Sequence, residues 1–238
     1  MTIIQDIWHG DSVEMCQRFK TGRVDCIITD PPFGVDNLSN MAVTEGGKKY
    51  ARKIANDETP EQAIAIFKQV MDVLLRRTAP ECDVYVFTSY QVLSDWLVMT
   101  DSFMALHNFS RKAVLVWEKE GPGMGDLNNP WGMGLEFILY FQKGRREKQA
   151  KRRNAVIHVP QLRPGDLIHP HEKPEPLLEL LIKASTSEGD FIVDPFGGSG
   201  SLARAARNCN RSAISIELDE ENFKLAKNKL DTKEEHMF

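Results

Sequence analysis

Residues 191–206 read FIVDPFGGSGSLARAA, and this stretch decides the class of fold. The apolar residues 191–193 and Asp194 after them are typical of a buried strand, and a glycine-rich turn separates it from a segment that favours a helix. Gly198, Gly200 and Ala203 fit the pattern G-x-G-x-x-G/A, in which missing side chains let a ligand approach the backbone. The stretch therefore predicts a strand, a glycine loop and a helix whose N-terminus can receive an anion.

A second predicted strand, 213–216, ends beside Glu217, which lies 19 positions after Gly198. An acidic residue at about this distance is placed to accept hydrogen bonds from ribose hydroxyls. The pattern favours a nucleoside cofactor over a purely structural turn. It does not separate nicotinamide dinucleotides from S-adenosylmethionine.

The rest of the chain alternates predicted strands with helical stretches, which indicates an α/β protein with a mostly parallel sheet between helices. Segments 113–117 and 136–141 break this alternation, because their connection is rich in glycine and shows no helical stripe; we expect an antiparallel edge hairpin. The seven predicted strands are 3–8, 24–29, 84–88, 113–117, 136–141, 191–193 and 213–216, and the predicted helices are 13–19, 60–77, 91–101, 175–184, 201–208 and 220–230.

The composition fits one folded domain over residues 1–238, since 42% of the residues are hydrophobic. No apolar run approaches the roughly 20 residues that span a bilayer, and the N-terminus lacks the layout of a signal peptide, which favours a cytoplasmic protein without membrane contact. Cys16, Cys26, Cys82 and Cys209 form no C-x-x-C pair, so we expect neither a metal site nor disulfides.

A second motif, DPPFG at residues 30–34, directly follows the predicted strand 24–29. Functional loops leave the carboxyl ends of strands in sheets of this kind. Proline fixes its own φ and holds the preceding residue extended, so Asp30 and Pro31 have little freedom. The motif thus presents a carboxylate, a carbonyl and an aromatic ring on a stiff turn.

These groups suit transfer of a methyl group to the exocyclic amine of a base, whose lone pair is conjugated with the ring. Asp30 and the carbonyl of Pro31 can each accept one N–H, while Phe33 stacks on the ring, which favours the tetrahedral nitrogen of the transition state. The base must leave the duplex to reach them. The alternative is a structural turn in which Asp30 caps a helix and Phe33 fills the core.

With HPHEKP at residues 169–174, these motifs resemble those of the DNA amino-methyltransferases, which modify adenine N6 or cytosine N4. The order is that of their β arrangement, a circular permutation in which the catalytic motif comes first, a recognition region follows and the cofactor motif comes last. The resemblance covers nearly the whole chain. It implies the Rossmann-like fold of S-adenosylmethionine-dependent methyltransferases.

By this resemblance, the catalytic residues are Asp30, Pro31, Pro32 and Phe33. Phe196 and the glycines would line the methionine part of the cofactor, Glu217 would hold its ribose, and Lys173 would lie near its amino-acid end. Asp11 would reach its adenine or, equally, cap the next helix; the alternative for Lys173 is a solvated surface lysine. The implied cofactor-binding set is Asp11, Lys173, Asp194, Phe196, Gly198, Ser199, Gly200 and Glu217.

The first residue of the catalytic motif favours adenine N6 as the target. Within the family, Asp before Pro-Pro usually accompanies adenine and Ser accompanies cytosine N4, which stays the alternative. Phe33 replaces the more frequent Tyr, which keeps stacking but loses a hydroxyl. No Cys follows a Pro, so C5-cytosine methylation is not indicated.

The predicted partner is double-stranded DNA. The formal net charge of −4 argues against indiscriminate coating of nucleic acid, but a local basic cluster lies within 142–168, where the family keeps its recognition region. This segment is short, so weak discrimination or help from a homodimer partner would fit; the alternative is a solvated charged loop. The predicted DNA-binding residues are Lys48, Lys49, Arg145, Arg146, Arg152 and Arg153.

Three rival functions stay open. A nicotinamide-dependent oxidoreductase shares the glycine loop but has no use for the motif at 30–33. RNA and protein-glutamine methyltransferases usually carry Asn at its first position and place the cofactor loop before it. An inactive DNA-binding relative is disfavoured, because Asp30 and both loop glycines are present.

Overall fold

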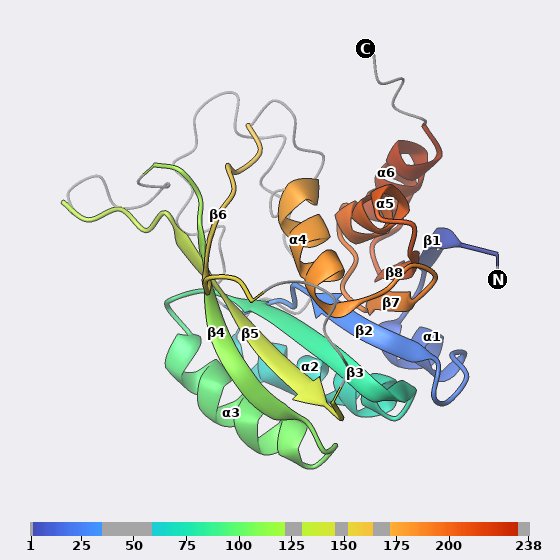
Figure 1. Ribbon diagram of the computed structural model, residues 1–238, viewed down its shortest axis with the longest axis horizontal. Coiled ribbons are helices and arrows are strands. Elements are labelled where there is room, and N and C mark those ends of the chain that lie inside the picture. Colours follow the sequence, from blue (N-terminus) through green and yellow to red (C-terminus); the bar gives the residue numbers. More distant parts are fainter. Residues whose placement is uncertain (1, 35–58, 122–129, 146–151, 164–171, 233–238) are drawn as a thin grey trace.

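The computed structural model describes residues 2–34, 59–121, 130–145, 152–163 and 172–232. Within these ranges eight strands form one sheet, with three helices on each of its faces (Figure 1). The strands are β1 (Gln5–His9), β2 (Val24–Thr29), β3 (Thr78–Thr88), β4 (Ser110–Glu118), β5 (Leu135–Lys143), β6 (Val156–His158), β7 (Phe191–Asp194) and β8 (Ser212–Glu217). The helices are α1 (Ser12–Gln17), α2 (Pro60–Leu75), α3 (Leu93–Ala105), α4 (Glu175–Ser185), α5 (Ser201–Asn208) and α6 (Glu220–Asp231).

The sheet runs in the order β1-β8-β7-β2-β3-β5-β4-β6, and its first five strands are parallel. Only β5 runs against its neighbours, pairing antiparallel with both β3 and β4. The mostly parallel sheet and the antiparallel hairpin of β4 and β5 are thereby confirmed. The carboxyl ends of β2, β3, β4, β7 and β8 consequently share one edge, together with the start of β5.

The sequence predicted seven strands, whereas the described residues form eight. The additional strand is β6, which lies within the predicted recognition segment 142–168. It pairs parallel with the last residues of β4, from Val116 to Glu118, so the hairpin is not at the edge of the sheet. Three residues are too few to show an alternating pattern in the sequence. Pairing with β4, a tertiary effect, makes them a strand.

Successive side chains along the strands point to opposite faces of the sheet and pack into two separate hydrophobic cores. In β2, Ile27 packs with α1, α2 and α3, whereas Cys26 and Ile28 pack with α4 and α5 on the opposite face. A smaller cluster joins Ile7 of β1 to α5 and α6. Both faces of the central strands are therefore buried, as expected for parallel strands.

Strands β2 and β7 are neighbours although most of the chain lies between them. From β2 the chain continues to β3 on one side, and from β7 it continues to β8 on the other, so the strand order reverses between them. Ligands of open α/β sheets bind outside the carboxyl ends of the strands at such a reversal. The loops after β2 and β7 carry the two motifs singled out in the sequence.

Candidate active site

The glycine loop after β7 has a backbone that only glycine adopts without strain. Gly198 and Gly200 have φ values of +49° and +67°. A Cβ on Gly200 would also overlap Ile7 Cδ1 of β1. The expected strand, loop and helix are confirmed, and the loop is packed closely under the first strand of the sheet.

Glu217 at the end of β8 faces this loop. Its Oε2 accepts a hydrogen bond from the backbone N–H of Gly198 at 2.7 Å, and its Oε1 accepts one from Asp219 at 2.8 Å. Burial raises the pKa of Glu217 above its ordinary value. A fixed carboxylate therefore stands beside the glycine loop, in the place where the sequence predicted a ribose acceptor.

Asp194 joins the glycine loop to β2, the strand that precedes Asp30. Its buried Oδ1 accepts hydrogen bonds from Thr29 Oγ1 of β2 at 2.9 Å and from the N–H of Phe196 at 3.0 Å. Burial raises the pKa of this carboxyl to about 7. Its bonds to both loops make Asp194 the link between them, while direct contact with a cofactor stays a prediction.

The structure brings Asp30 and Lys173, two predicted site residues from distant segments, into direct contact. Lys173 Nζ lies 2.6 Å from Asp30 Oδ2, and only 8% of Lys173 is exposed, so the alternative of a solvated surface lysine was wrong. Burial raises the pKa of Asp30, and the ammonium of Lys173 opposes this rise only in part. Burial alone would lower the pKa of Lys173, but its neighbouring carboxylates raise it, so the ammonium stays charged.

The second oxygen of Asp30 differs from the first. Asp30 Oδ1 is buried and has no hydrogen-bond partner among the described residues. A buried carboxylate oxygen without a donor costs free energy, of about 1–3 kcal/mol. Such an atom is suited to accept an N–H from a ligand that enters the site.

Two further charged residues complete the group and were missed in the sequence. Glu136, at the start of β5, lies 2.6 Å from Lys173 Nζ through its Oε1 and 2.7 Å from Lys119 Nζ through its Oε2. We call Asp30, Lys173, Glu136 and Lys119 the charged cluster. The one signal in the sequence was a glutamate inside the apolar run LEFILYF.

The rest of the DPPF motif is held by packing. Phe33 is half-buried and meets Trp96 of α3 edge to face, with ring centroids 6.0 Å apart. Gly34 follows with φ +75°, and a Cβ there would collide with the backbone of Thr59 at the start of α2. The turn is therefore anchored at its aromatic ring and at its glycine.

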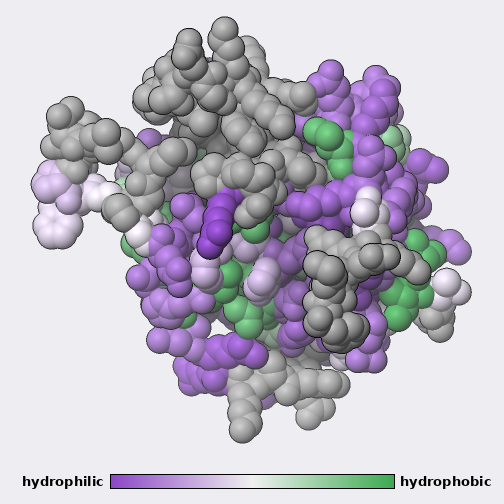
Figure 2. Space-filling view, turned by 90° about the horizontal axis from the view of Figure 1, so that it is seen from above, coloured by the Kyte–Doolittle hydropathy of each residue, from purple (hydrophilic) through white to green (hydrophobic). Residues whose placement is uncertain are grey.

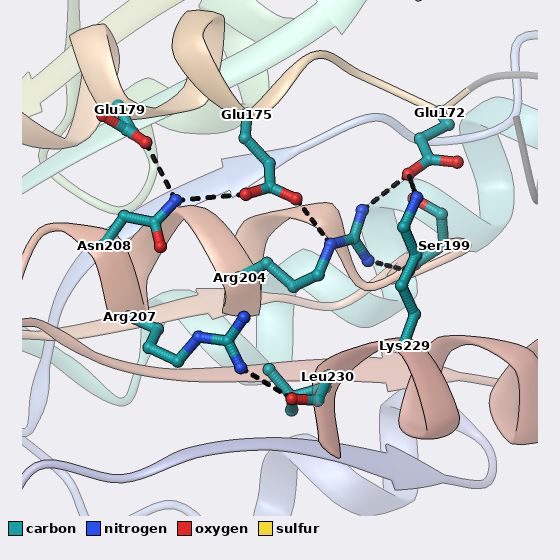
Figure 3. A network of polar contacts seen from close by, with 9 residues as sticks. All are labelled: Glu172, Glu175, Glu179, Ser199, Arg204, Arg207, Asn208, Lys229 and Leu230. Atoms are coloured by element: carbon teal, nitrogen blue, oxygen red, sulfur yellow. Dashed lines mark hydrogen bonds and ion pairs between the residues drawn. The ribbon is translucent and has the colours of Figure 1, made fainter. Parts of the chain in front are cut away.

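A buried arginine ties the glycine loop to the segment that carries Lys173 (Figure 3). Arg204 of α5 donates to the carbonyl of Ser199 at 2.7 Å, to Glu172 at 2.5 Å and to Glu175 at 2.6 Å. Lys229 of α6 also reaches Glu172, at 3.0 Å. Glu172 is thus linked through Arg204 to the glycine loop, while its neighbour Lys173 is paired with Asp30.

Asp11 caps α1, accepting hydrogen bonds from the N–H groups of Val13 at 2.8 Å and Glu14 at 3.1 Å. The capping interpretation is confirmed, and contact with the cofactor's adenine stays a prediction. The next residue, Ser12, donates to the carbonyl of Pro195 at 2.5 Å. The turn after β1 therefore lies against the cofactor loop.

The predicted DNA-binding residues fall into three groups. Lys48, Lys49 and Arg146 lie outside the described residues. Arg145 is exposed at the end of β5, and because Lys143 pairs with Cys82 near the start of β3, it lies at the edge opposite Asp30. Arg152 and Arg153 are exposed and lead into β6, beside the end of β4. Arg145, Arg152 and Arg153, the members of the predicted set that the structure describes, thus do not form one continuous patch.

Neither a membrane-spanning helix nor a group of metal-ligating side chains occurs in the part of the chain that the structure describes. No described helix has the length and apolar character needed to cross a bilayer. No three of the described His, Cys, Asp and Glu side chains are grouped as metal ligands would be. The four cysteines are buried as free thiols.

Comparison with known proteins identifies the family. A family model described as DNA methylase, of the N6/N4 methyltransferases, matches residues 24–228. The chain belongs to this family. This DNA methyltransferase is 46% identical to the type II methyltransferase M.HpaI of Haemophilus parainfluenzae over 94% of the chain and 73% of the relative. It is also 26% identical to M2.DpnII of Streptococcus pneumoniae, over 95% and 90% of the two chains.

Solved structures show the same fold for the methyltransferase. The M1.HpyAVI complex with S-adenosylmethionine superimposes with a TM-score of 0.69 and 24% identity, over 95% of this chain and 99% of the other. The cytosine-N4-specific PvuII methyltransferase gives a TM-score of 0.70 at 17% identity, over 98% and 89%. The expected S-adenosylmethionine-dependent methyltransferase fold is confirmed. Members of the family use this cofactor, so that expectation is confirmed as well.

Proposed function

We propose that this DNA methyltransferase transfers a methyl group from S-adenosylmethionine to the N6 amine of an adenine that is flipped out of double-stranded DNA. The observation that carries the proposal is the state of Asp30. One of its oxygens is held by Lys173, and the other is buried without a partner among the described residues. A flipped base that offers an N–H would supply the missing donor.

The residues present fit the cofactor. Gly198 and Gly200 both have positive φ, and a side chain on Gly200 would collide with Ile7, so the loop is built of residues that let a ligand approach the backbone closely. Glu217 offers a carboxylate for ribose hydroxyls, and Phe196 offers an aromatic ring beside the loop. When bound, S-adenosylmethionine supplies an electrophilic methyl group; the protein must position the amine against it.

The catalytic turn performs that positioning. Asp30 Oδ1 accepts one N–H of the amine and the carbonyl of Pro31 accepts the other, which draws the nitrogen lone pair out of conjugation with the ring. Phe33, steadied by Trp96, stacks on the base. The raised pKa of Asp30 makes its carboxylate a stronger hydrogen-bond acceptor than an ordinary one.

Asp at position 30 supports adenine over cytosine, because cytosine-N4 enzymes of this type usually carry Ser there. The fold does not choose between the bases, since the cytosine-specific PvuII enzyme shares it.

The face in Figure 2 is mostly hydrophilic where it is coloured, with apolar residues in small separate groups. Such a face suits a polar partner such as the DNA backbone.

The test is incubation of the purified protein with labelled S-adenosylmethionine and unmodified DNA, followed by nucleoside digestion and mass spectrometry. We expect labelled N6-methyladenine and no labelled N4-methylcytosine. N4-methylcytosine would overturn the choice of base but keep the mechanism. Label in RNA or protein, with none in DNA, would overturn the proposal as a whole.

A further inference from the structure

The charged cluster contains more charged groups than the proposed chemistry uses. Of the four charged groups only Asp30 would meet the amine, yet Lys173, Glu136 and Lys119 continue from it as an alternating series of charges. The three ion-pair distances lie between 2.6 and 2.7 Å. Lys173 and Glu136 are both buried, so neither charge is solvated by bulk water. Buried charges are costly unless each is paired, which calls for an explanation of the whole series.

Strand direction explains how these residues meet. Glu136 is the second residue of β5, which starts at the edge where β3 ends, because Phe137 pairs with Thr88. Lys119 directly follows β4, which ends at the same edge. Glu136 thus reaches Lys173 from the side of the hairpin, while Lys173 reaches Asp30 from the segment before α4.

Aromatic rings fix both ammonium groups. Lys173 Nζ lies 5.0 Å from the centroid of Phe87, and Lys119 Nζ lies 4.9 Å from that of Trp117. These contacts are cation–π interactions and restrict where each ammonium can move. Glu136 lies between the two lysines, and each of its oxygens forms an ion pair with a different one.

We propose that Glu136, held by Lys119, is a positioning residue that fixes Lys173 on Asp30 Oδ2 and so keeps Oδ1 available for the target amine. Without Glu136, the ammonium of Lys173 would have a single carboxylate partner and would be free to bridge both of its oxygens. This inference rests on the proposed function, in which Asp30 accepts an N–H of the amine. It adds two residues of the β4–β5 hairpin to the machinery of transfer.

The charges in the cluster predict in which direction the pKa of Asp30 changes when a neighbouring charge is removed. The titratable and charged groups that act on Asp30 are Lys173, Glu136 and Lys119, and Asp194 interacts with it from β7. The negative charge of Glu136 raises the pKa of Asp30, and the positive charge of Lys119 lowers it. Neutralising the two residues should therefore move the acidic limb of the reaction in opposite directions.

The experiment measures single-turnover methyl transfer to DNA from pH 5 to pH 9, at saturating cofactor and DNA, for the full chain and two isosteric or near-isosteric variants. For Glu136→Gln we expect a rate 10- to 100-fold lower, a cofactor Kd within about threefold of the wild type and an acidic limb lower by about 0.5 pH unit. For Lys119→Gln we expect a smaller loss of rate and an acidic limb that moves to higher pH. Circular dichroism at each pH verifies folding.

A purely structural role would lower the active fraction without moving the limbs apart. Glu179→Gln is the matched control, because Glu179 of α4 also binds a lysine, Lys183, and lies outside the charged cluster; we expect a wild-type rate and limb. Wild-type rates in Glu136→Gln, or limbs that do not separate, overturn the inference. If Glu136→Gln does not fold, the upward shift in Lys119→Gln decides alone. Absence of methyl transfer by the wild type would instead refute the proposed function.

Discussion

The glycine loop and the charged cluster adjoin each other but are built in different ways. The loop is local: strand β7, its turn and helix α5 follow one another in the chain, and Glu217 comes soon afterwards. The cluster draws on four segments, which are the ends of β2 and β4, the start of β5 and the residue before Pro174. Backbone conformation shapes the first region, and the packing of the sheet shapes the second.

The largest expected effect comes from removing Asp30, the member of the cluster that is proposed to meet the target amine. Asp30→Ala should lower kcat by about 10³-fold, because it removes an acceptor that acts in the transition state, while cofactor Kd stays within a few-fold. Methyl-transfer assays and calorimetric titration of the cofactor measure the two quantities. Asp30→Asn keeps an acceptor oxygen without the charge and should be intermediate. Wild-type turnover in Asp30→Ala would refute the proposed mechanism.

The connection between the two regions is the next target. Arg204→Met should lower the free energy of unfolding by about 3 kcal/mol, because Glu172 and Glu175 lose the guanidinium that both of them bind in a buried site. Urea denaturation measures it. Arg76→Met is the control, since its pair with Asp72 is exposed, and its midpoint should match the wild type. Equal midpoints for the two variants would show that the network does not stabilise the fold.

A substitution in the glycine loop should weaken cofactor binding, whereas a substitution of Asp30 should lower turnover. Gly198→Val should weaken cofactor binding about 100-fold, because a β-branched residue is strained at φ +49° and intrudes on the loop. Gly22→Val is the matched control: Gly22 has φ +77° in open space, so its variant is strained without touching the site. Calorimetric titration compares the two. Similar affinities in both variants would remove Gly198 from the cofactor site.

Asp194, which links the glycine loop to β2 just before Asp30, should make the stability of the protein depend on pH. Its folded pKa of about 7 exceeds the ordinary value of 3.8, so its stabilising contribution is complete below pH about 4 and is lost as the pH rises through 7. Between pH 5 and pH 8 the wild type should therefore lose about 2 kcal/mol more stability than Asp194→Asn. Denaturation of both proteins at the two pH values measures this difference. Parallel pH dependences would contradict it.

The smallest effect concerns the approach of DNA. Replacing Arg152 and Arg153 by Ala should weaken DNA binding only a few-fold and reduce the slope of log affinity against log salt by about 0.9 per lost phosphate contact. Arg145→Ala should change the slope less, because Arg145 lies at the opposite edge of the sheet. Fluorescence anisotropy over a range of salt concentrations compares them. A larger change for Arg145 would reverse this assignment.

What the sequence predicted follows the same division between the regions. Apolar runs and helical patterns predicted every described helix and seven of the eight strands, and the glycines predicted a backbone that the structure contains. Glu136 and Lys119 carried no recognisable spacing, since their partners lie in other segments. Lys173 was noticed only through the family resemblance. Its burial against Asp30 follows from packing, which a single sequence does not display.

The shared edge of the sheet also has a consequence for synthesis of the protein. Thr29 is hydrogen-bonded to Asp194, 165 positions away in the chain. Strand β1 pairs with β8, which is the last described strand along the chain. A nascent chain on the ribosome therefore holds the turn after β2 long before β7, one of the two neighbours of β2, emerges. Such distant pairings form late and slowly in folding. A copy interrupted before β7 has no glycine loop beside Asp30, so we expect methyltransferase activity only from chains completed through β8.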